Sequence, residues 1–288
     1  MPDKFSAANF QYRDSVFRDF FNEPRRLLSL CNAILGSSYS NPTDIEINTL
    51  ETNFFSALKN DISCKIGDQF LILVEHQSTV NNNMPFRCLA YVSELFNNLV
   101  ADKNRLYRKD IFRLPSPKFF VFYDGTAPEP LQRTLRLSDA FNDENPALEL
   151  VVTSFNINAR LNQPLLQKCR ELSDYSTLIA KVREGCANGL SRRDAIIQAV
   201  NWCIDNGVMS DYLYIKRNEV FTMLDWQWNL DDAKAAWKEE GREEGINQRS
   251  EEIAVNLIRM GIPAQNICDA TGLPPQRIQA LARLSNSK

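Results

Sequence analysis

Residues 60–79 read NDISCKIGDQFLILVEHQST, and this stretch decides the fold. It contains two strand-like runs, Ile62–Ile66 and Phe70–Val74, in which β-branched and other apolar residues dominate. Gly67-Asp68 between the runs is a turn signal, so the stretch predicts a β-hairpin. The second run is apolar at every position, which is typical of a strand buried on both faces inside a sheet.

The segments on either side of the hairpin alternate between helix and strand patterns. Residues 13–35 carry apolar side chains at helical spacing, interrupted by Pro24, which predicts a pair of amphipathic helices. Pro85 opens another helical pattern, and further strands are expected at Lys118–Tyr123 and Leu148–Phe155. A helix that crosses between strands of one sheet is typical of an α/β domain.

The character of the sequence changes after this region, which predicts four parts. Residues 1–162 form the α/β domain, and residues 163–229 form a helical extension without strand-like runs. Residues 230–252 hold eight acidic and four basic side chains and read as a solvated connecting helix. Residues 253–288 form a small basic tail.

The tail has the rhythm of a helix-turn-helix unit. Gly272 ends a first helix, and Pro274 opens a second one with Ile278 facing inward. Arg277 and Arg283 then face outward, where they could contact DNA or a protein partner. The C-terminal helices could also join copies of the chain into a homo-oligomer, although no clean heptad is present.

Composition excludes several classes of protein. The formal net charge of -3 excludes a bulk polycation, so any contact with nucleic acid must come from local patches. The single histidine, His76, leaves no room for a His-rich metal site, and none of the seven cysteines forms a C-x-x-C pair. The longest apolar runs have five residues, and the N-terminus lacks the apolar stretch of a signal peptide. We therefore expect a soluble cytoplasmic protein with reduced thiols and no membrane contact.

The polar end of the second strand is the candidate site. Glu75 and Gln77 share one face of the strand while His76 points to the other, and the hairpin brings Asp61 close to Glu75. Two converging carboxylates form an oxygen-rich site that suits Mg²⁺ or another divalent cation. Such a site can activate water for attack on a phosphodiester, and Arg87 or Lys65 could supply positive charge. His76 itself reads as a structural histidine.

Connected words of sequence resemble a known family. Asp61 followed by Glu75-x-Gln77 is similar to the PD-(D/E)XK nuclease pattern, in the variant with glutamine at the lysine position. The surrounding words resemble the recombination-promoting nuclease (Rpn) family, whose members are also named putative transposases. These words are Lys59-Asn60-Asp61, Glu75–Thr79, Asn83–Arg87, Tyr123-Asp124-Gly125, Leu135–Phe141, Tyr12–Phe17 and Glu239–Gly245.

The resemblance implies a function and roles for residues. It implies a restriction-endonuclease-like PD-(D/E)XK core, a mixed central sheet flanked by helices, followed by an all-helical C-terminal region. It implies a metal-dependent DNA endonuclease of low sequence specificity that promotes DNA recombination. Asp61 and Glu75 would then be catalytic metal ligands with the backbone carbonyl of His76, Gln77 would be the third catalytic residue, and Asp14 could assist from the first helix.

Two departures from the family pattern leave alternatives open. Asn60 replaces the proline, and Gln77 replaces the lysine, so the means of water activation is not given by the pattern. The alternative function is a non-catalytic DNA-binding or protein-interaction protein on a degenerate nuclease core. A DDE-type transposase is disfavoured because it needs a third separated acid, for which Asp124 or Asp139 would have to lie beside Glu75.

A second basic stretch lies between the helix at Pro85 and the strand at Lys118. It reads either as a solvated helix end or as a phosphate-contacting surface beside the active site. The candidate DNA contacts in it are Arg105, Arg108, Lys109 and Arg113.

Overall fold

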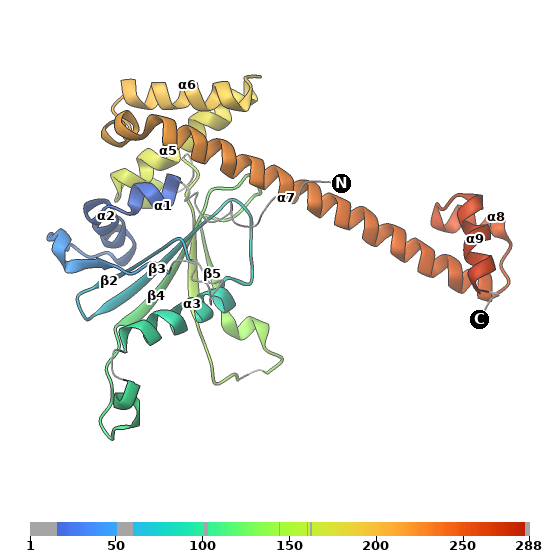
Figure 1. Ribbon diagram of the computed structural model, residues 1–288, viewed down its shortest axis with the longest axis horizontal. Helices are drawn as coiled ribbons and strands as arrows, with labels where there is room; N and C mark the ends of the chain where they lie inside the picture. The colour runs from blue at the N-terminus through green and yellow to red at the C-terminus, as the bar shows by residue number, and fades with distance from the viewer. Residues whose placement is uncertain are drawn as a thin grey trace, which may run out of the picture. The chain divides into compact units, whose positions relative to one another are not determined.

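The computed structural model describes residues 16–50, 60–100, 103–143, 145–159, 161 and 163–285. Its contacts divide the chain into two compact units, Met1–Gln227 and Trp228–Lys288 (Figure 1). Each unit has a hydrophobic core of its own, and the candidate site lies in the first.

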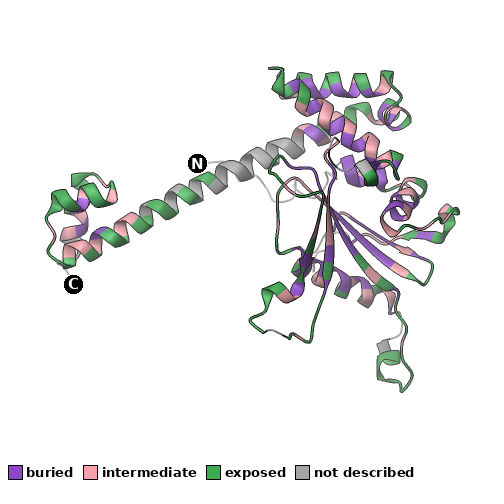
Figure 2. Ribbon diagram, turned by 180° about the vertical axis from the view of Figure 1, so that it is seen from behind, coloured by how far each residue is buried: buried purple, intermediate pink, exposed green. Residues whose placement is uncertain are grey.

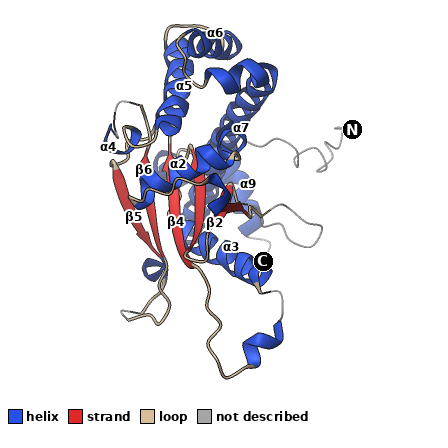
Figure 3. Cartoon of the chain, turned by 90° about the vertical axis from the view of Figure 1, so that its left-hand side faces the viewer, coloured by secondary structure: helices blue, strands red, loops and turns tan. Residues whose placement is uncertain are grey.

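The first unit is built on a mixed six-stranded sheet of order β1-β2-β3-β4-β6-β5 (Figure 3). β1, β2 and β3 form an antiparallel meander, β4 and β6 then run parallel to β3, and β5 closes the edge antiparallel to β6. The strands are Ile45–Ile47, Ile62–Ile66, Phe70–Gln77, Ser116–Tyr123, Gln132–Arg136 and Val151–Asn156 in the order β1 to β6.

The predicted hairpin is confirmed as β2 and β3. Gly67 has a φ of +50°, a left-handed conformation that glycine adopts at little cost, and the strands pair from Ile66 opposite Phe70 to Ile62 opposite Val74. Leu71 to Val74 are all buried because β3 lies between two strands and has helices on both faces. Figure 2 shows buried residues along the strands of the sheet and on the helices that pack against it.

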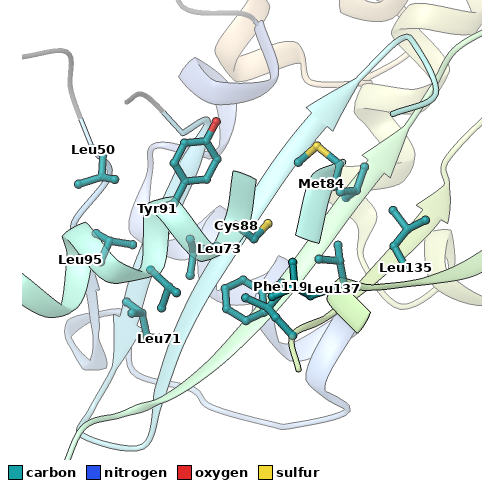
Figure 4. Close-up of a cluster of buried hydrophobic side chains, with 14 residues drawn as sticks. Leu50, Leu71, Leu73, Met84, Cys88, Tyr91, Leu95, Phe119, Leu135 and Leu137 are labelled. Atoms are coloured by element: carbon teal, nitrogen blue, oxygen red, sulfur yellow. The ribbon is translucent and has the colours of Figure 1, made fainter. Parts of the chain in front are cut away.

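One face of the sheet is covered by α3 (Met84–Leu99), as the pattern after Pro85 predicts. Side chains of α3 pack on β3, β4, β5 and β6 in one buried cluster that Figure 4 shows. The cluster comprises Leu50, Leu71, Leu73, Met84, Cys88, Tyr91, Val92, Leu95, Phe119, Val121, Leu135, Leu137, Leu150 and Val152. Burial of this apolar surface fixes the first turn of α3 over the end of β3 where the polar residues lie.

Helices from both ends of the first unit cover the other face. The predicted N-terminal pair is α1 (Val16–Phe21) and α2 (Pro24–Leu35), and Gly36 ends α2 in the left-handed conformation. Phe17 of α1 contacts Phe122 of β4 and Tyr175 of α5. Among the described residues of this unit, further helices are α4 (Gln163–Leu166), α5 (Arg170–Ala187) and α6 (Arg192–Asp205). Short 3-10 helices there lie at Pro42–Asp44, Lys103–Tyr107 and Leu137–Ala140.

The second unit contains the two-helix tail. α7 (Ser210–Arg259) continues into this unit, where α8 (Ala264–Thr271) and α9 (Pro275–Ser285) follow. Gly272 is the left-handed cap between α8 and α9, and Ile278 is buried, as the helix-turn-helix pattern predicts. The prediction of an α/β region with helices flanking a mixed sheet, followed by a helical C-terminal region, is therefore confirmed for the described residues.

Two details of the prediction are wrong. The edge strand β5 was not expected, because its sequence QRTLR is polar and only Leu135 is buried. The basic stretch does not lie beside the candidate site: Ser116, which follows it, pairs with Phe70 at the start of β3, whereas Glu75 pairs with Val121. The cause is the parallel direction of β4, which places the segment before β4 at the amino end of β3.

Two further features are the cysteines and the hydropathy of the helices. All seven cysteines are free thiols, and five of them are buried. Within the described part of the chain, no helix combines the length and apolar character needed to span a bilayer.

Candidate active site

The hairpin register brings Asp61 and Glu75 together. Ile62 pairs with Val74, so Asp61 stands opposite Glu75 just before β2 begins. The backbone N–H of Asp61 donates to Oε1 of Glu75 at 3.1 Å, and the backbone N–H of His76 donates to Oδ2 of Asp61 at 2.7 Å. Each carboxylate is thus fixed by the strand that carries the other, as expected from the sequence pattern.

Glu75 is almost completely buried, with 3% of its surface exposed. Burial raises the pKa of Glu75 to about 8, and the negative charge of Asp61 adds to this rise. The guanidinium of Arg87 and the hydrogen bond from the Asp61 amide act in the opposite direction. Two neighbouring carboxylates in a low-dielectric site therefore favour the uptake of a positive charge, either a proton or a cation.

Arg87 and Gln77 complete the polar cluster on the α3 face. Nη2 of Arg87 lies 2.9 Å from Oε2 of Glu75, and its Nε and Nη2 donate to the hydroxyl of Tyr91 at 3.1 and 2.8 Å. The amide Nε2 of Gln77 donates to Sδ of Met84 at 2.7 Å. The first turn of α3 therefore orients both residues, and 39% of the Arg87 side chain faces solvent.

His76 lies on the opposite face, as predicted for a structural histidine. Its Nε2 is 3.1 Å from Oδ2 of Asp124 and 3.1 Å from the hydroxyl of Tyr175, and its ring stacks on Phe17 at 4.8 Å. Burial lowers the pKa of His76, but the carboxylate of Asp124 outweighs burial and holds this pKa above its ordinary value. Burial conversely raises the pKa of Asp124, and His76 together with Arg183 outweighs it and lowers that pKa.

The sequence does not predict Tyr175 and Arg183 as partners of this region, and it offers Asp124 only as a possible third acid beside Glu75. Arg183 donates to the backbone carbonyl of Asp124 and lies 3.8 Å from its carboxylate. The only local signal was Asp124-Gly125 directly after a buried strand, since α5 lies far away in the sequence. Because the carboxylate of Asp124 contacts His76 and Arg183, it does not serve as a third acid beside Glu75.

The donor set fits a hard divalent cation. The ligands available at the end of β3 are the carboxylates of Asp61 and Glu75 and the backbone carbonyl of His76, which are oxygen donors of the kind Mg²⁺ prefers. No cluster of three or more His, Cys, Asp or Glu side chains suited to a metal occurs among the described residues. A cation here would therefore keep several waters, which is the usual coordination of Mg²⁺ in proteins.

The remaining candidate residues lie elsewhere. Arg105, Arg108, Lys109 and Arg113 are exposed on the segment between α3 and β4, and Arg105 stacks on Phe112 at 4.7 Å. Their contact with DNA stays a prediction, although their expected position beside the carboxylates is wrong.

The accessory candidate Asp14 and the two candidate DNA contacts of the tail, Arg277 and Arg283, complete the set. Asp14 and the side chain of Arg283 lie outside the described residues. Arg277 forms a bidentate ion pair with Glu251 of α7 at 2.7 and 2.8 Å. Two of its N–H groups are thereby engaged within the second unit.

Comparison with known proteins gives the family. A sequence profile described as "Putative transposase, YhgA-like" matches residues 11–161, which include the whole candidate site. The chain belongs to this family. A curated relative, "Inactive recombination-promoting nuclease-like protein RpnE" of Escherichia coli (strain K12), is 29% identical over 150 residues.

The match with the relative spans part of each protein. The alignment with the relative covers 51% of this chain and 46% of the relative, so it spans about half of each protein. No solved structure matches this chain. The YhgA-like family membership thus supports the expected resemblance to the Rpn and transposase group, and the relative's name makes catalysis the property to be tested.

Proposed function

We propose that this protein is a metal-dependent DNA endonuclease of low sequence specificity with a PD-(D/E)XK-like core, whose cuts promote DNA recombination. The observation that carries the proposal is the reciprocal link between Asp61 and Glu75 at the end of β3, with Gln77 on the same face. A carboxylate as buried as Glu75 is costly unless it is paired or binds a cation. Membership of a transposase family, and a relative named as nuclease-like, support the same conclusion.

The residues divide the work as follows. Asp61 and Glu75, with the backbone carbonyl of His76, would hold Mg²⁺ or another divalent cation. When bound, such a cation supplies Lewis-acid stabilisation of the phosphate and lowers the pKa of a coordinated water. The amide oxygen of Gln77 is the acceptor that would orient the attacking water, and Gln77 itself stays neutral in this role.

Arg87 provides the positive charge that the missing lysine would have carried. Its guanidinium contacts Glu75 and is partly exposed, so it can also donate to a phosphate oxygen at the rim of the site. We assign to Arg87 the stabilisation of negative charge on the phosphate. The hydroxyl of Tyr91, which accepts a hydrogen bond from Arg87, fixes the orientation of the guanidinium.

The alternative is a non-catalytic DNA-binding or interaction protein on a degenerate nuclease core. Three observations favour it: Gln77 replaces the lysine, Arg87 occupies one oxygen of Glu75, and the relative in Escherichia coli is named inactive. In this case the Asp61–Glu75 pair would be a remnant of a former site. A cytoplasmic location and a homo-oligomer formed through the C-terminal helices remain predictions under both alternatives.

Plasmid cleavage separates the two alternatives. Purified full-length protein is incubated with supercoiled plasmid in Mg²⁺ or in EDTA, beside Asp61→Asn and Glu75→Gln. The control is Asp68→Asn, a fully exposed carboxylate on the β2–β3 turn. We expect the wild type and the control to nick or linearise the plasmid in Mg²⁺. In Asp61→Asn and Glu75→Gln the cleavage rate should fall at least about a hundredfold, since each variant lacks one proposed metal ligand.

A further variant tests the role of the missing lysine. If the wild type does not cut but Gln77→Lys does, and Asp61→Asn abolishes that gain, the core is degenerate and the alternative holds. If Asp61→Asn and Glu75→Gln both cleave as fast as the wild type, this site does not catalyse the cleavage.

A further inference from the structure

A cavity of about 330 Å³ adjoins the first turn of α3. It lies between this turn and the edge of the sheet, where β5 passes into the 3-10 helix Leu137–Ala140. Most of its lining comes from two of the sequence words, Asn83–Arg87, of which the candidate site uses only Met84 and Arg87, and Leu135–Phe141. The lining residues are Asn82, Asn83, Pro85, Phe86, Arg133, Leu135, Arg136, Leu137, Asp139 and Ala140.

The sheet register places this cavity at the level of Glu75. Glu75 pairs with Val121, Val121 with Ser154, and Ser154 with Arg133, so Glu75 and Arg133 stand in one row across β3, β4, β6 and β5. Directly paired residues point to the same face, which here is the α3 face that also holds Leu135. Three strand spacings separate the two ends of the row by about 14 Å.

The chemistry of the lining is an aromatic ring beside fixed polar groups. Phe86 is 66% exposed, although it follows the buried Pro85 in a helix packed on the core. Nη2 of Arg133 donates to Oδ1 of Asn82 at 2.7 Å, and its Nη1 lies 3.5 Å from Glu129. Arg133 is thus held in place on the wall of the cavity.

The rim on the side of the 3-10 helix is also polar. Nη1 of Arg136 lies 3.3 Å from Glu149, and 53% of its side chain is exposed. Asp139 is exposed on the same rim. A flat ring, amide and carboxylate groups for a base edge, and guanidinium groups for a phosphate form the set that recognises a nucleotide.

We propose that this cavity binds one unpaired nucleobase of the DNA strand, with Phe86 stacking on the base and Arg133 on its flanking phosphate. The inference rests on the proposed nuclease function, because it takes DNA as the substrate. The site then prefers DNA with an unpaired or extruded nucleotide a few positions from the phosphate beside Glu75. An already unpaired base avoids the unstacking cost that a paired base must meet.

The test measures binding without cleavage. A short duplex with one bulged 2-aminopurine and its fully paired counterpart are titrated with full-length protein in EDTA, with anisotropy giving both affinities and 2-aminopurine fluorescence reporting stacking. Phe86→Leu removes the ring and keeps an apolar side chain, while Arg133→Gln removes the charge. The matched control is Tyr214→Leu, another exposed aromatic, at 79%, on α7 and outside the candidate DNA contacts.

We expect the wild type and Tyr214→Leu to bind the bulged duplex roughly tenfold more tightly than the paired duplex, with quenched fluorescence, in line with the stacking of one base on an aromatic ring. Phe86→Leu should reduce the preference to about twofold or less and relieve the quenching. Equal affinities in the wild type, or a preference that survives in Phe86→Leu, overturn the proposal. Quenching by the free 2-aminopurine nucleotide without a preference between duplexes also overturns it, since a free nucleotide would then be the ligand.

The two proposals fail separately. Asp61-dependent plasmid cleavage without the bulge preference refutes the base pocket alone. A Phe86-dependent preference without cleavage refutes the nuclease function and leaves the pocket on a DNA-binding protein.

Discussion

At the scale of single residues, the main feature of the site is the buried carboxylate of Glu75 and the contacts that offset the cost of its burial. Glu75 receives one hydrogen bond from the Asp61 amide and one from Arg87, and both compensate part of the loss of solvent. The proximity of Asp61 works against them and keeps the pKa of Glu75 high. A cation bound beside Glu75 would therefore also stabilise the folded protein.

The burial of Glu75 predicts a pH dependence of stability in the absence of metal. The pKa of Glu75 is raised to about 8 in the folded protein, whereas the unfolded chain ionises near the ordinary value of 4.5. Between these values the unfolded state loses a proton that the folded state keeps, so stability falls as pH rises through this window. Thermal melts in EDTA from pH 5 to 8 should show a falling melting temperature for the wild type and a flatter curve for Glu75→Gln.

The control for this prediction is Glu46→Gln, an exposed carboxylate on β1 with a side chain 66% exposed. Its curve should run parallel to that of the wild type. A Glu75→Gln curve that is also parallel to the wild type across the whole range would contradict the prediction.

Gly125 carries a second prediction at this scale. A Cβ at this position would lie 2.0 Å from the backbone oxygen of Ser78 and 2.5 Å from the hydroxyl of Tyr123. The backbone oxygen has little freedom to move, so Gly125→Ala should destabilise the protein by about 3 kcal/mol, at the upper end of the usual cost of overpacking. Urea unfolding measures the change, and Thr126→Ala, at the next and exposed position, should stay within about 0.5 kcal/mol of the wild type. Equal stability of Gly125→Ala and Thr126→Ala would show that the loop relaxes freely.

At the scale of elements, the sequence predicts those helices and strands that a contiguous run of residues is enough to identify. The hairpin of β2 and β3 follows from two strand-like runs and a glycine turn, and α3 follows from helical spacing after Pro85. β5 escaped prediction because an edge strand with one buried residue has no apolar alternation to detect. The direction of β4 is a tertiary property, and for that reason the position of the basic stretch was wrong.

The same distinction applies to the candidate site. Asp61 and Glu75 are 14 residues apart in one hairpin, so spacing and register predict their approach. His76 and Tyr175 are 99 residues apart, and their contact depends on how α5 packs across the sheet. Nothing in the local sequence of α5 indicates this contact.

The ion pair that attaches α1 to α7 should have a measurable coupling energy. Lys216, which has non-helical φ and ψ within α7, places its Nζ 2.7 Å from both oxygens of Asp19, and the hydroxyl of Tyr212 donates to the same carboxylate at 2.6 Å. The side chains are 34% and 23% exposed, so solvent screening limits the pair to about 1 kcal/mol. A double-mutant cycle of Asp19→Asn and Lys216→Met, read by urea unfolding, should give this coupling energy.

A more exposed ion pair serves as the reference for that cycle. Lys65 and Asp68 are 3.4 Å apart, with the side chain of Asp68 fully exposed. Their coupling energy should be well below that of Asp19 and Lys216, because solvent screens the fully exposed carboxylate. A value for Asp19 and Lys216 no larger than this would mean that the ion pair does not contribute to the attachment of α1 to α7.

At the scale of the whole molecule, the family match and the candidate site coincide within the first unit. The profile covers residues 11–161, and the buried α7 side chains of that unit include Leu213, Val220 and Leu224. The second unit has a separate small core of Ala254, Ile267, Ile278 and Leu281. Each unit therefore buries its own apolar surface, which is the condition for folding independently.

This organisation predicts the effect of removing residues 228–288. The chain Met1–Gln227 retains the α7 side chains that pack in its own core, so its melting temperature should lie within a few degrees of the first transition of the full chain. Plasmid cleavage should persist and still depend on Asp61, because no candidate metal ligand lies in the removed part. Binding to a paired duplex should weaken by less than about threefold, since Glu251 takes two N–H groups of Arg277 in a bidentate pair. Arg87 and Arg133, by contrast, each contact a carboxylate through a single nitrogen. Differential scanning fluorimetry, the plasmid assay and anisotropy measure the three outcomes, with Asp61→Asn in the shortened chain as the control for cleavage. A shortened chain that folds with an unchanged melting temperature but binds DNA tenfold more weakly would instead assign DNA selection to α8 and α9.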